Sequence, residues 1–225
     1  MKLPREVPVM TLPNATLFPQ AFLTLYIFEP RYRQMLANAL HSNRIFSVAM
    51  QRPGSTRETP LPVAGLGLIR VSVGHWDGTS HLILQGLARV ELEQTVRYKP
   101  YRIQRIRPLQ TPPCDNVAVD SLIAKMRELL AEQIELGLAS SLPMVSLDNS
   151  DSNPAPPSSS PKAMMHYLDS FTNLDQAVDL VSRAVLPGAV ERQAILEAVD
   201  VEARLRQLIH FLLAEIRAKR KDNGS

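Results

Sequence analysis

Cysteine and glycine are scarce in this sequence, and long hydrophobic runs are absent. The single cysteine, Cys114, rules out an internal disulfide framework and a cysteine-rich zinc or iron–sulfur site, and without an activating base we expect it to be inert. With only 9 glycines, a glycine-rich phosphate-binding loop is not expected. There is no signal-peptide-like apolar run at the start and no run of about 18 apolar residues to span a membrane. We therefore expect a cytoplasmic protein that has no membrane partner.

Length and charge together predict two structural units. The chain has 225 residues, enough for one large domain or two small ones, each able to bury a core without metals or disulfides. Residues 1–113 carry 14 basic and 6 acidic side chains, whereas residues 114–225 carry 11 and 16. The first half therefore has a net charge of +8 and the second half of −5. Because the two halves differ in sign, we place separate domains at 1–113 and 114–221.

The first half has the pattern of a small β-structure with one helix. Its apolar runs are short and are interrupted by prolines, polar loops and the turn dipeptide Asp77-Gly78. Helical spacing of the apolar residues after Pro30 predicts the helix, which ends near Leu40. This arrangement predicts a small antiparallel barrel or sandwich. The expected strands are residues 7–12, 17–28, 45–50, 63–73, 81–85, 89–96 and 101–109.

Two of these strands alternate regularly enough to predict which residues share a face. In the strand at 63–73, Val71 and Val73 share a face with the apolar residues before them. In the strand at 89–96, Val90 points inward, so Arg89 is expected to point outward.

After residue 113 the apolar period changes from that of strands to that of helices. An amphipathic stripe from Leu122 to Ile134 ends at Gly137, a residue typical of helix C-termini. Residues 141–163 are rich in serine, proline and aspartate, which predicts a flexible linker. The second half is therefore predicted to be an α-helical bundle. The remaining helices are expected near 167–171, at 174–185, up to 199 and from 201 to 216, followed by a solvated basic tail.

Several sequence blocks, in a fixed order, carry a family resemblance. Segment 7–36 contains LPN, then LFP, then IFEPRYR, an order that chance does not explain. With these blocks the sequence resembles the N-terminal domain of the Lon protease family, the Lon substrate-binding domain. The resemblance leaves out 141–163, which is longer and more polar than expected for that family. The other matching blocks are RIFSVAM (44–50), GLGLIRV (65–71), LILQGLARVELEQ (82–94), YKPYRIQRIRPL (98–109) and RQAILEAVDVEARLRQLIHFLLAEI (192–216).

The resemblance implies an α+β fold, in which a PUA-like β-barrel pseudo-domain is followed by an α-helical bundle. Lon proteases continue into an ATPase and a Ser–Lys protease domain. The phosphate-binding loop of such an ATPase needs Gly-Lys-Ser/Thr, and none of the 9 glycines is followed by Lys. We therefore expect a stand-alone member that is not an enzyme, with no catalytic residues, no cofactor and no metal.

Two further groups of polar residues, the hairpin histidines and the glutamate before the helix, are expected to have structural roles. His75 and His81 flank the hairpin turn, but a metal site there would require further ligands, so we expect exposed hairpin residues. Glu29 is expected to accept hydrogen bonds at the start of the helix or to pair with Arg31 or Arg33.

Aromatic side chains near the start of the chain form the first candidate binding site. An edge rich in aromatic residues and proline is a surface on which an extended polypeptide adds a strand or fills apolar pockets. The function this favours is a non-catalytic module that binds unfolded or partly folded client proteins. Such a module would be linked to ATP-dependent proteolysis through a protease or a chaperone. The candidate residues are Phe18, Phe22, Tyr26, Phe28 and Tyr32.

A basic strand supports an alternative function, RNA binding. Residues 97–107 combine five Arg or Lys with two Tyr, so phosphate attraction and base stacking are both available, and PUA-like barrels include RNA binders. Strand alternation divides these charges between two faces, which is typical of a solvated strand. The candidate nucleic-acid-binding residues are Tyr101, Arg105 and Arg107.

Overall fold

Two compact units make up the chain, residues 1–110 (unit 1) and 111–225 (unit 2). The computed structural model describes residues 3–55, 57–113, 116–137 and 174–223. The predictions that lie outside the described residues are the linker at 141–163, the helix near 167–171 and the inert Cys114.

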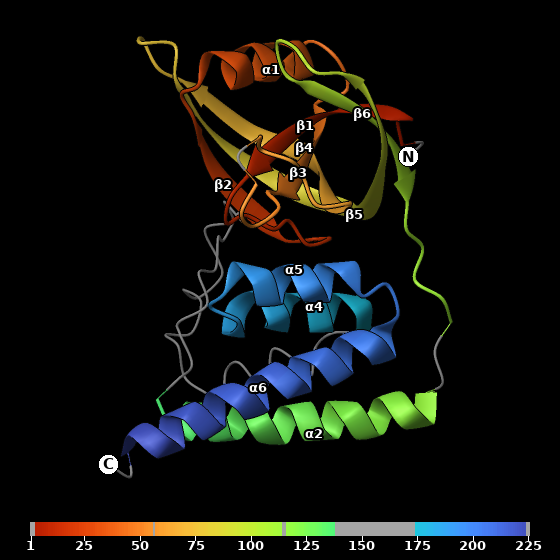
Figure 1. Cartoon of the computed structure of the whole chain (residues 1–225), viewed down its shortest axis with the longest axis vertical. Helices are drawn as coiled ribbons and strands as arrows, with labels where there is room; N and C mark the ends of the chain where they lie inside the picture. The colour runs from red at the N-terminus through yellow and green to blue at the C-terminus, as the bar shows by residue number, and fades with distance from the viewer. Residues whose placement is uncertain (1–2, 56, 114–115, 138–173, 224–225) are drawn as a thin grey trace, which may run out of the picture. The chain divides into compact units, whose positions relative to one another are not determined.

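Unit 1 is a six-stranded mixed sheet with one helix (Figure 1). The helix has the bounds that the sequence predicts, and each strand overlaps a segment predicted to be extended. In chain order the elements are β1 (Glu6–Leu12), β2 (Phe22–Ile27), α1 (Pro30–Leu40), β3 (Ile45–Met50), β4 (Val63–Gly74), β5 (Ser80–Arg97) and β6 (Arg102–Pro108).

The strands of unit 1 pair in a closed ring. β1 and β3 are parallel, and the other pairs are antiparallel. β6 pairs with both β1 and β5, so β5, β4, β3, β1 and β6 are each hydrogen-bonded to two neighbours within the ring. β2 lies outside the ring, along the first part of β5.

Apolar side chains at regular spacing place α1 and β3 in the core. α1 begins at Pro30, whose fixed φ suits a first helical turn. β3 is buried along its whole length because alternate residues enter two core clusters. Phe46 faces the cluster shared with α1, and Ile45 faces the other. The α1 residues in the core are Tyr32, Met35, Leu36 and Ala39.

Two glycines let the loop before β2 pass directly over the sheet. A Cβ at Gly65 would lie 2.0 Å from the backbone oxygen of Leu17, and a Cβ at Gly86 would lie 1.9 Å from that of Phe18. No side chain fits at such distances, so this close approach requires glycine. The loop in turn buries Leu17 and Phe18 in unit 1.

Gly86→Ala is expected to destabilise unit 1 by about 1–3 kcal/mol, because the new methyl group overlaps the carbonyl oxygen of Phe18. Urea denaturation followed by circular dichroism measures the change. Gly74→Ala is the matched control and should leave the midpoint unchanged, since the atom nearest to its Cβ is the Ser80 Oγ at 3.9 Å. Equal urea midpoints for the two variants would contradict the close approach of the Phe18 backbone to Gly86.

Two predicted side-chain environments are wrong. The register of β4 against β5 shifts between Ile69 and Val71, and this irregularity leaves Val71 and Val73 exposed although Ile69 is buried. Arg89, which is predicted to point outward, is not exposed to solvent, since only 5% of it is accessible. In addition, β5 is one strand of 18 residues and not two, because it continues through Gly86.

Unit 2 contains helices that pack on one another. α2 (Asn116–Glu135) and α6 (Val201–Asn223) lie alongside each other, and α6 also contacts α4 (Leu174–Val185) and α5 (Ala189–Glu197) (Figure 1). The residues after 216 are mostly exposed, as the predicted solvated tail requires, but they are helical, because α6 continues to Asn223. In this part of α6, Arg220 pairs with Glu132 of α2 at 2.6 Å. None of the described helices is both long and apolar enough to cross a membrane.

A fully buried arginine links helices of unit 2. Arg204 of α6 donates hydrogen bonds to Asp179 Oδ1 at 2.8 Å and to Asp175, both on α4. It also donates to the backbone oxygen of Val199 at 3.2 Å. A buried charge is tolerated when it is paired and hydrogen-bonded, so this network holds α4 against the start of α6.

Candidate functional site

The outward face of strands β2, β5 and β4 carries exposed apolar side chains. Residues directly opposite each other in antiparallel strands point to the same face. Tyr26 of β2 pairs with His81 of β5, which pairs with Val73 of β4. Two residues along, Ile83 of β5 pairs with Val71 of β4 on the same face. We call this surface the outer face, and its members are Phe22, Tyr26, Phe28, Val71, Val73, His81 and Ile83.

Four rings form a row on this surface. The Phe28 and Tyr26 centroids are 5.9 Å apart, and those of Tyr26 and His81 are 4.7 Å apart. His81 meets His75 edge-on at 5.0 Å, and the His75 Nε2 lies 2.7 Å from the His81 Nδ1. Because Tyr26 is 48% and Phe28 59% exposed, the row presents aromatic surface to solvent. Rigid exposed aromatic rings are well suited to act as anchors in protein binding.

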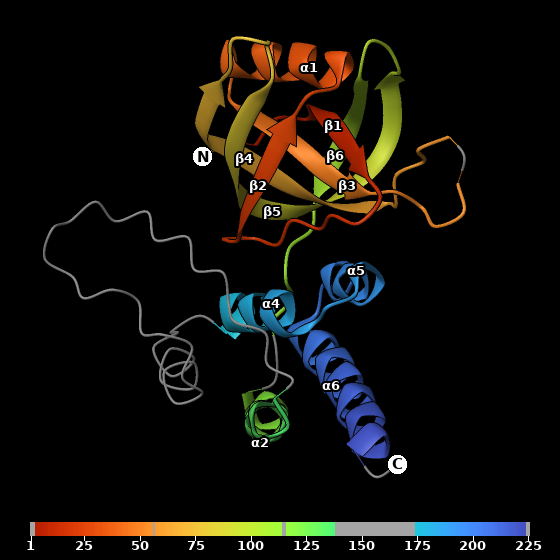
Figure 2. The ribbon, with the colours of Figure 1, turned by 90° about the vertical axis from the view of Figure 1, so that its left-hand side faces the viewer.

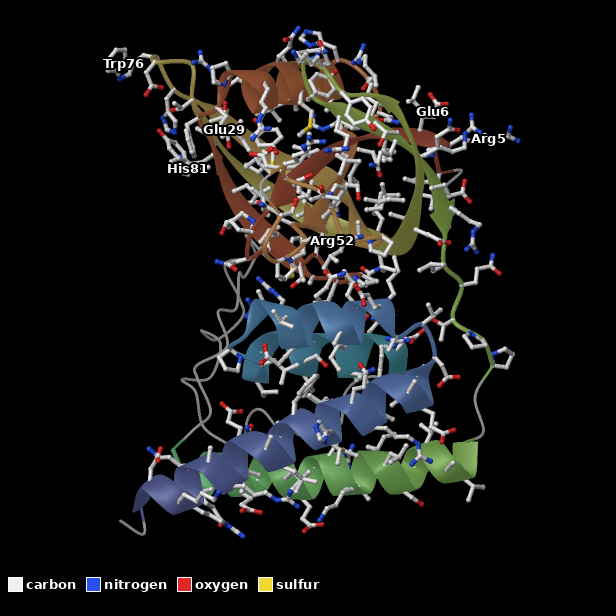
Figure 3. All side chains as sticks on the ribbon, in the orientation of Figure 1. Arg5, Glu6, Glu29, Arg52, Trp76 and His81 are labelled. Atoms are coloured by element: carbon white, nitrogen blue, oxygen red, sulfur yellow. The ribbon has the colours of Figure 1, made fainter. Side chains whose placement is uncertain are left out.

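The hairpin between β4 and β5 extends the aromatic row to Trp76, the one tryptophan of the chain. Trp76 is 100% exposed and projects from the hairpin tip (Figure 3). Thr79 donates its backbone N–H to the Asp77 carboxylate at 2.9 Å, and Gly78 has φ of 78°, which together shape the turn. A Cβ on Gly78 would overlap the Arg33 guanidinium, so this side chain of α1 reaches the turn. Trp76 thus precedes a turn whose shape depends on Asp77 and Gly78.

An ion-pair network lies just after Phe28 in the sequence. Arg31 donates its Nε–H to Glu29 Oε2 at 2.8 Å and its Nη2–H to Glu58 Oε1 at 2.8 Å. The pairing predicted between Glu29 and Arg31 is confirmed, whereas no side-chain hydrogen bond caps the helix. Hydrogen bonds from Arg31 lower the pKa of Glu58, so this link stabilises the fold above about pH 4 and is lost as the pH falls.

The aromatic residues predicted to bind polypeptide fall into two groups. Phe22, Tyr26 and Phe28 lie on the outer face. Phe18 and Tyr32 are 0% and 5% exposed, so the prediction of a binding surface is wrong for these two. The reason is that Phe18 lies in the loop that covers the sheet, while the Tyr32 hydroxyl donates a hydrogen bond of 3.1 Å to the backbone of β1.

Of the residues predicted to bind nucleic acid, Arg105 and Arg107 are exposed on the outward side of β6, but Tyr101 is not exposed with them. Tyr101 is 4% exposed, so its ring is not available to stack on a base. Arg105 lies 3.8 Å from Glu6, and Arg107 pairs with two glutamates of β5. These carboxylates reduce the attraction that the two arginines exert on phosphate. Figure 3 shows Glu6 on the side of unit 1 opposite to the hairpin tip.

Four members of the outer face, and Trp76 beside it, have no predicted binding role. The four members are Val71, Val73, His81 and Ile83. Val73 is 53% exposed because of the register shift in β4, which strand alternation in the sequence does not reveal. For Trp76 a signal exists in the Asp77-Gly78 turn that follows it, since the tip of a tight hairpin projects away from the sheet.

The two histidines of the hairpin are exposed, as predicted. Their close nitrogen atoms provide two of the ligands that a metal ion would need. Within the described residues, no group of three or more His, Cys, Asp or Glu is placed to hold a metal ion.

Solved structures share this α+β fold. The chain is similar to the N-terminal domain of the Mycobacterium avium complex Lon protease, with a TM-score of 0.68 and 14% identity, over 92% of this chain and 97% of that one. It is also similar to a Lon N-terminal domain protein from Xanthomonas campestris, with a TM-score of 0.57 and 17% identity, over 91% and 97% of the two chains. At these identities the likeness establishes the fold alone.

The sequence comparison identifies the family. Residues 6–214 match the family described as the ATP-dependent protease La (LON) substrate-binding domain, and the chain therefore belongs to it. Lon protease 2 of Myxococcus xanthus is 24% identical over 217 residues, which are 93% of this chain and 24% of that protein. The Lon protease of Desulfosudis oleivorans is 26% identical over 220 residues, 94% and 24% of the two chains. The chain thus spans about a quarter of the length of these relatives.

Proposed function

We propose that this protein is a non-catalytic module that binds exposed apolar segments of unfolded or partly folded proteins in the cytoplasm, in connection with ATP-dependent proteolysis. The observation that carries the proposal is the outer face, with its exposed row of rings from Phe28 to His75 beside the fully exposed Trp76. Such a surface gains free energy when apolar side chains of a client displace water from it. The family's description as a substrate-binding domain supports the same role.

The proposal places the binding surface on a PUA-like barrel at 1–113 that precedes an α-helical bundle at 114–221. The closed ring of strands supports the barrel, and the mutual packing of α2, α4, α5 and α6 supports the bundle. The partners are client proteins and a protease or chaperone that receives them. The name Lon protease, carried by the relatives, favours a protease as the receiver.

Binding of a permanently unfolded protein, with reduced and alkylated cysteines and no tryptophan, tests this function. Trp76 is the sole tryptophan and is fully exposed, so its fluorescence reports directly on the hairpin tip beside the outer face. We expect a blue shift of the emission that saturates at roughly micromolar client, and no shift with the folded form of the same client. Calorimetry that detects no binding up to about millimolar client would refute the proposal.

The nucleic-acid alternative is tested with single-stranded RNA and the variant Arg105→Gln with Arg107→Gln. Because Tyr101 is buried and both arginines have acidic partners, we expect no salt-dependent retention on RNA and unchanged client binding by the variant. RNA binding that weakens steeply with salt and is lost in the variant would favour the nucleic-acid function instead.

A further inference from the structure

β2 is an edge strand with one unpaired side in the described part of the chain. It hydrogen-bonds to β5 over residues 22–27, and no other described strand pairs with it. Figure 2 looks onto unit 1 from the side on which β2 lies. On an edge strand, alternate residues direct their N–H and C=O groups away from the sheet, where another strand can pair with them.

This edge lacks the features with which natural proteins block strand addition. Exposed edges usually carry a charged residue, a proline or a bulge. The sequence of β2, FLTLYI, has no charge and no proline, and its pairing with β5 runs over six residues without a register shift. The edge is therefore open to a further strand.

Apolar side chains along β2 are left partly uncovered on both of its faces. Leu23 and Leu25 point toward the core cluster beneath α1 but are only partly buried. On the other face, Phe22 is partly buried and Tyr26 is exposed. A strand added beside β2 would place its alternate side chains next to these residues on the two faces.

We propose, building on the proposed function, that client proteins bind by adding an extended segment as a strand along the free edge of β2. The client main chain then contributes affinity irrespective of sequence, and the aromatic row selects segments with apolar side chains at alternate positions. The occupant is another protein and not a second copy of this chain, since residues 1–113 carry a net charge of +8 and two copies of this part of the chain repel each other. The same charge favours segments flanked by acidic residues.

The test uses two isomers of one probe peptide, in which valine alternates with threonine between terminal aspartates. One isomer is N-methylated at the valine amides and the other at the threonine amides, so each loses one alternating set of N–H donors. A strand on a single edge directs only one of these sets toward β2. We therefore expect one isomer to bind at least about tenfold more weakly than the other, measured by competition with the unmodified fluorescent peptide. Because the peptide carries the change, the protein's own folding is unaffected.

The other possible results distinguish a failure of strand addition from a failure of the proposed function. Equal affinity of the two isomers would overturn strand addition and leave client binding by the outer face intact. A protein that binds the unfolded client but not the unmodified peptide would also overturn it. Absence of binding to both peptide and client would instead refute the proposed function. Sedimentation velocity provides a further check: a concentration-dependent dimer that excludes the peptide, so that peptide binding falls as the dimer forms, would assign the edge to a second copy and overturn the proposal.

Discussion

Arg204→Leu is expected to destabilise unit 2 by about 3–5 kcal/mol. The Arg204 side chain is 0% exposed, and its removal leaves the carboxylate of Asp179, a residue only 2% exposed, without the guanidinium that pairs with it. A buried charge deprived of its counter-charge cannot be hydrated, which is why such truncations are among the most damaging single changes. Denaturant unfolding followed by far-ultraviolet circular dichroism measures the loss, because unit 2 is helical.

Two further variants distinguish the cost of leaving a buried charge without its counter-charge from the cost of losing an ion pair. Arg206 lies on the same helix and pairs with Glu202 at 2.6 Å, but its side chain is 63% exposed. Arg206→Leu should therefore cost less than about 1 kcal/mol. In the double variant Arg204→Leu with Asp179→Leu, the buried Asp179 carboxylate is removed together with the guanidinium, and much of the lost stability should return. Equal effects of Arg204→Leu and Arg206→Leu would contradict the buried network.

Client binding is expected to weaken by about 2–4 kcal/mol, roughly 30- to 1,000-fold, when Tyr26 and Phe28 are both replaced by serine. The two rings stack on each other at 5.9 Å and are about half exposed, so their removal takes away aromatic anchors without opening the core. The unfolding midpoint should therefore stay close to that of the wild type. The Trp76 fluorescence titration and calorimetry both measure the affinity.

The matched control for this variant is the replacement of Val96 and Tyr98 by serine. These residues are 49% and 68% exposed, so similar apolar surface is removed from unit 1. Val96 lies near the end of β5 and Tyr98 in the turn before β6, outside the outer face. We expect unchanged client affinity for this control. Equal weakening by both double variants would mean that clients bind by general hydrophobicity and not at the outer face.

Local signals in the sequence are strong enough to predict several elements of the fold. Pro30 and the apolar spacing that follows it give α1 its bounds, and the continuous apolar run at 45–50 gives the buried strand β3. Both depend on residues close to one another in the chain, where propensity and periodicity act. The same holds for α4, whose apolar stripe ends before Pro187.

The wrong predictions arise where distant segments meet. The register shift at Arg70 depends on the pairing of β4 with β5, and no alternation within β4 reports it. The glycines at 65 and 86 are needed because a loop from residues 17–18 crosses the sheet there. Burial of Arg204 likewise depends on partners on α4 that lie 25 and 29 residues away in sequence, so charge alone predicts the wrong environment.

The candidate site could be predicted in part. The aromatic density of residues 18–28 indicates the strand that carries the outer face, and three of the five predicted residues lie on that face. Phe18 is buried because its loop passes over Gly86, and Tyr32 is buried because it hydrogen-bonds from α1 to β1. Neither contact can be seen in the spacing of apolar residues in the sequence. The contributions of Val73 and His81 depend on how β4 and β2 are aligned with β5, and this alignment is a long-range property.

The central claim is that clients bind the outer face of unit 1, and mapping the contact by nuclear magnetic resonance tests it most directly. The measurement follows the backbone amide signals of the isotope-labelled chain as unlabelled unfolded client is added. We predict that the largest changes fall on residues 22–28, 71–76 and 81–83, which form the outer face and the hairpin tip. Changes confined to residues 102–107 or to the helices of unit 2, with the outer face unaffected, would contradict the account.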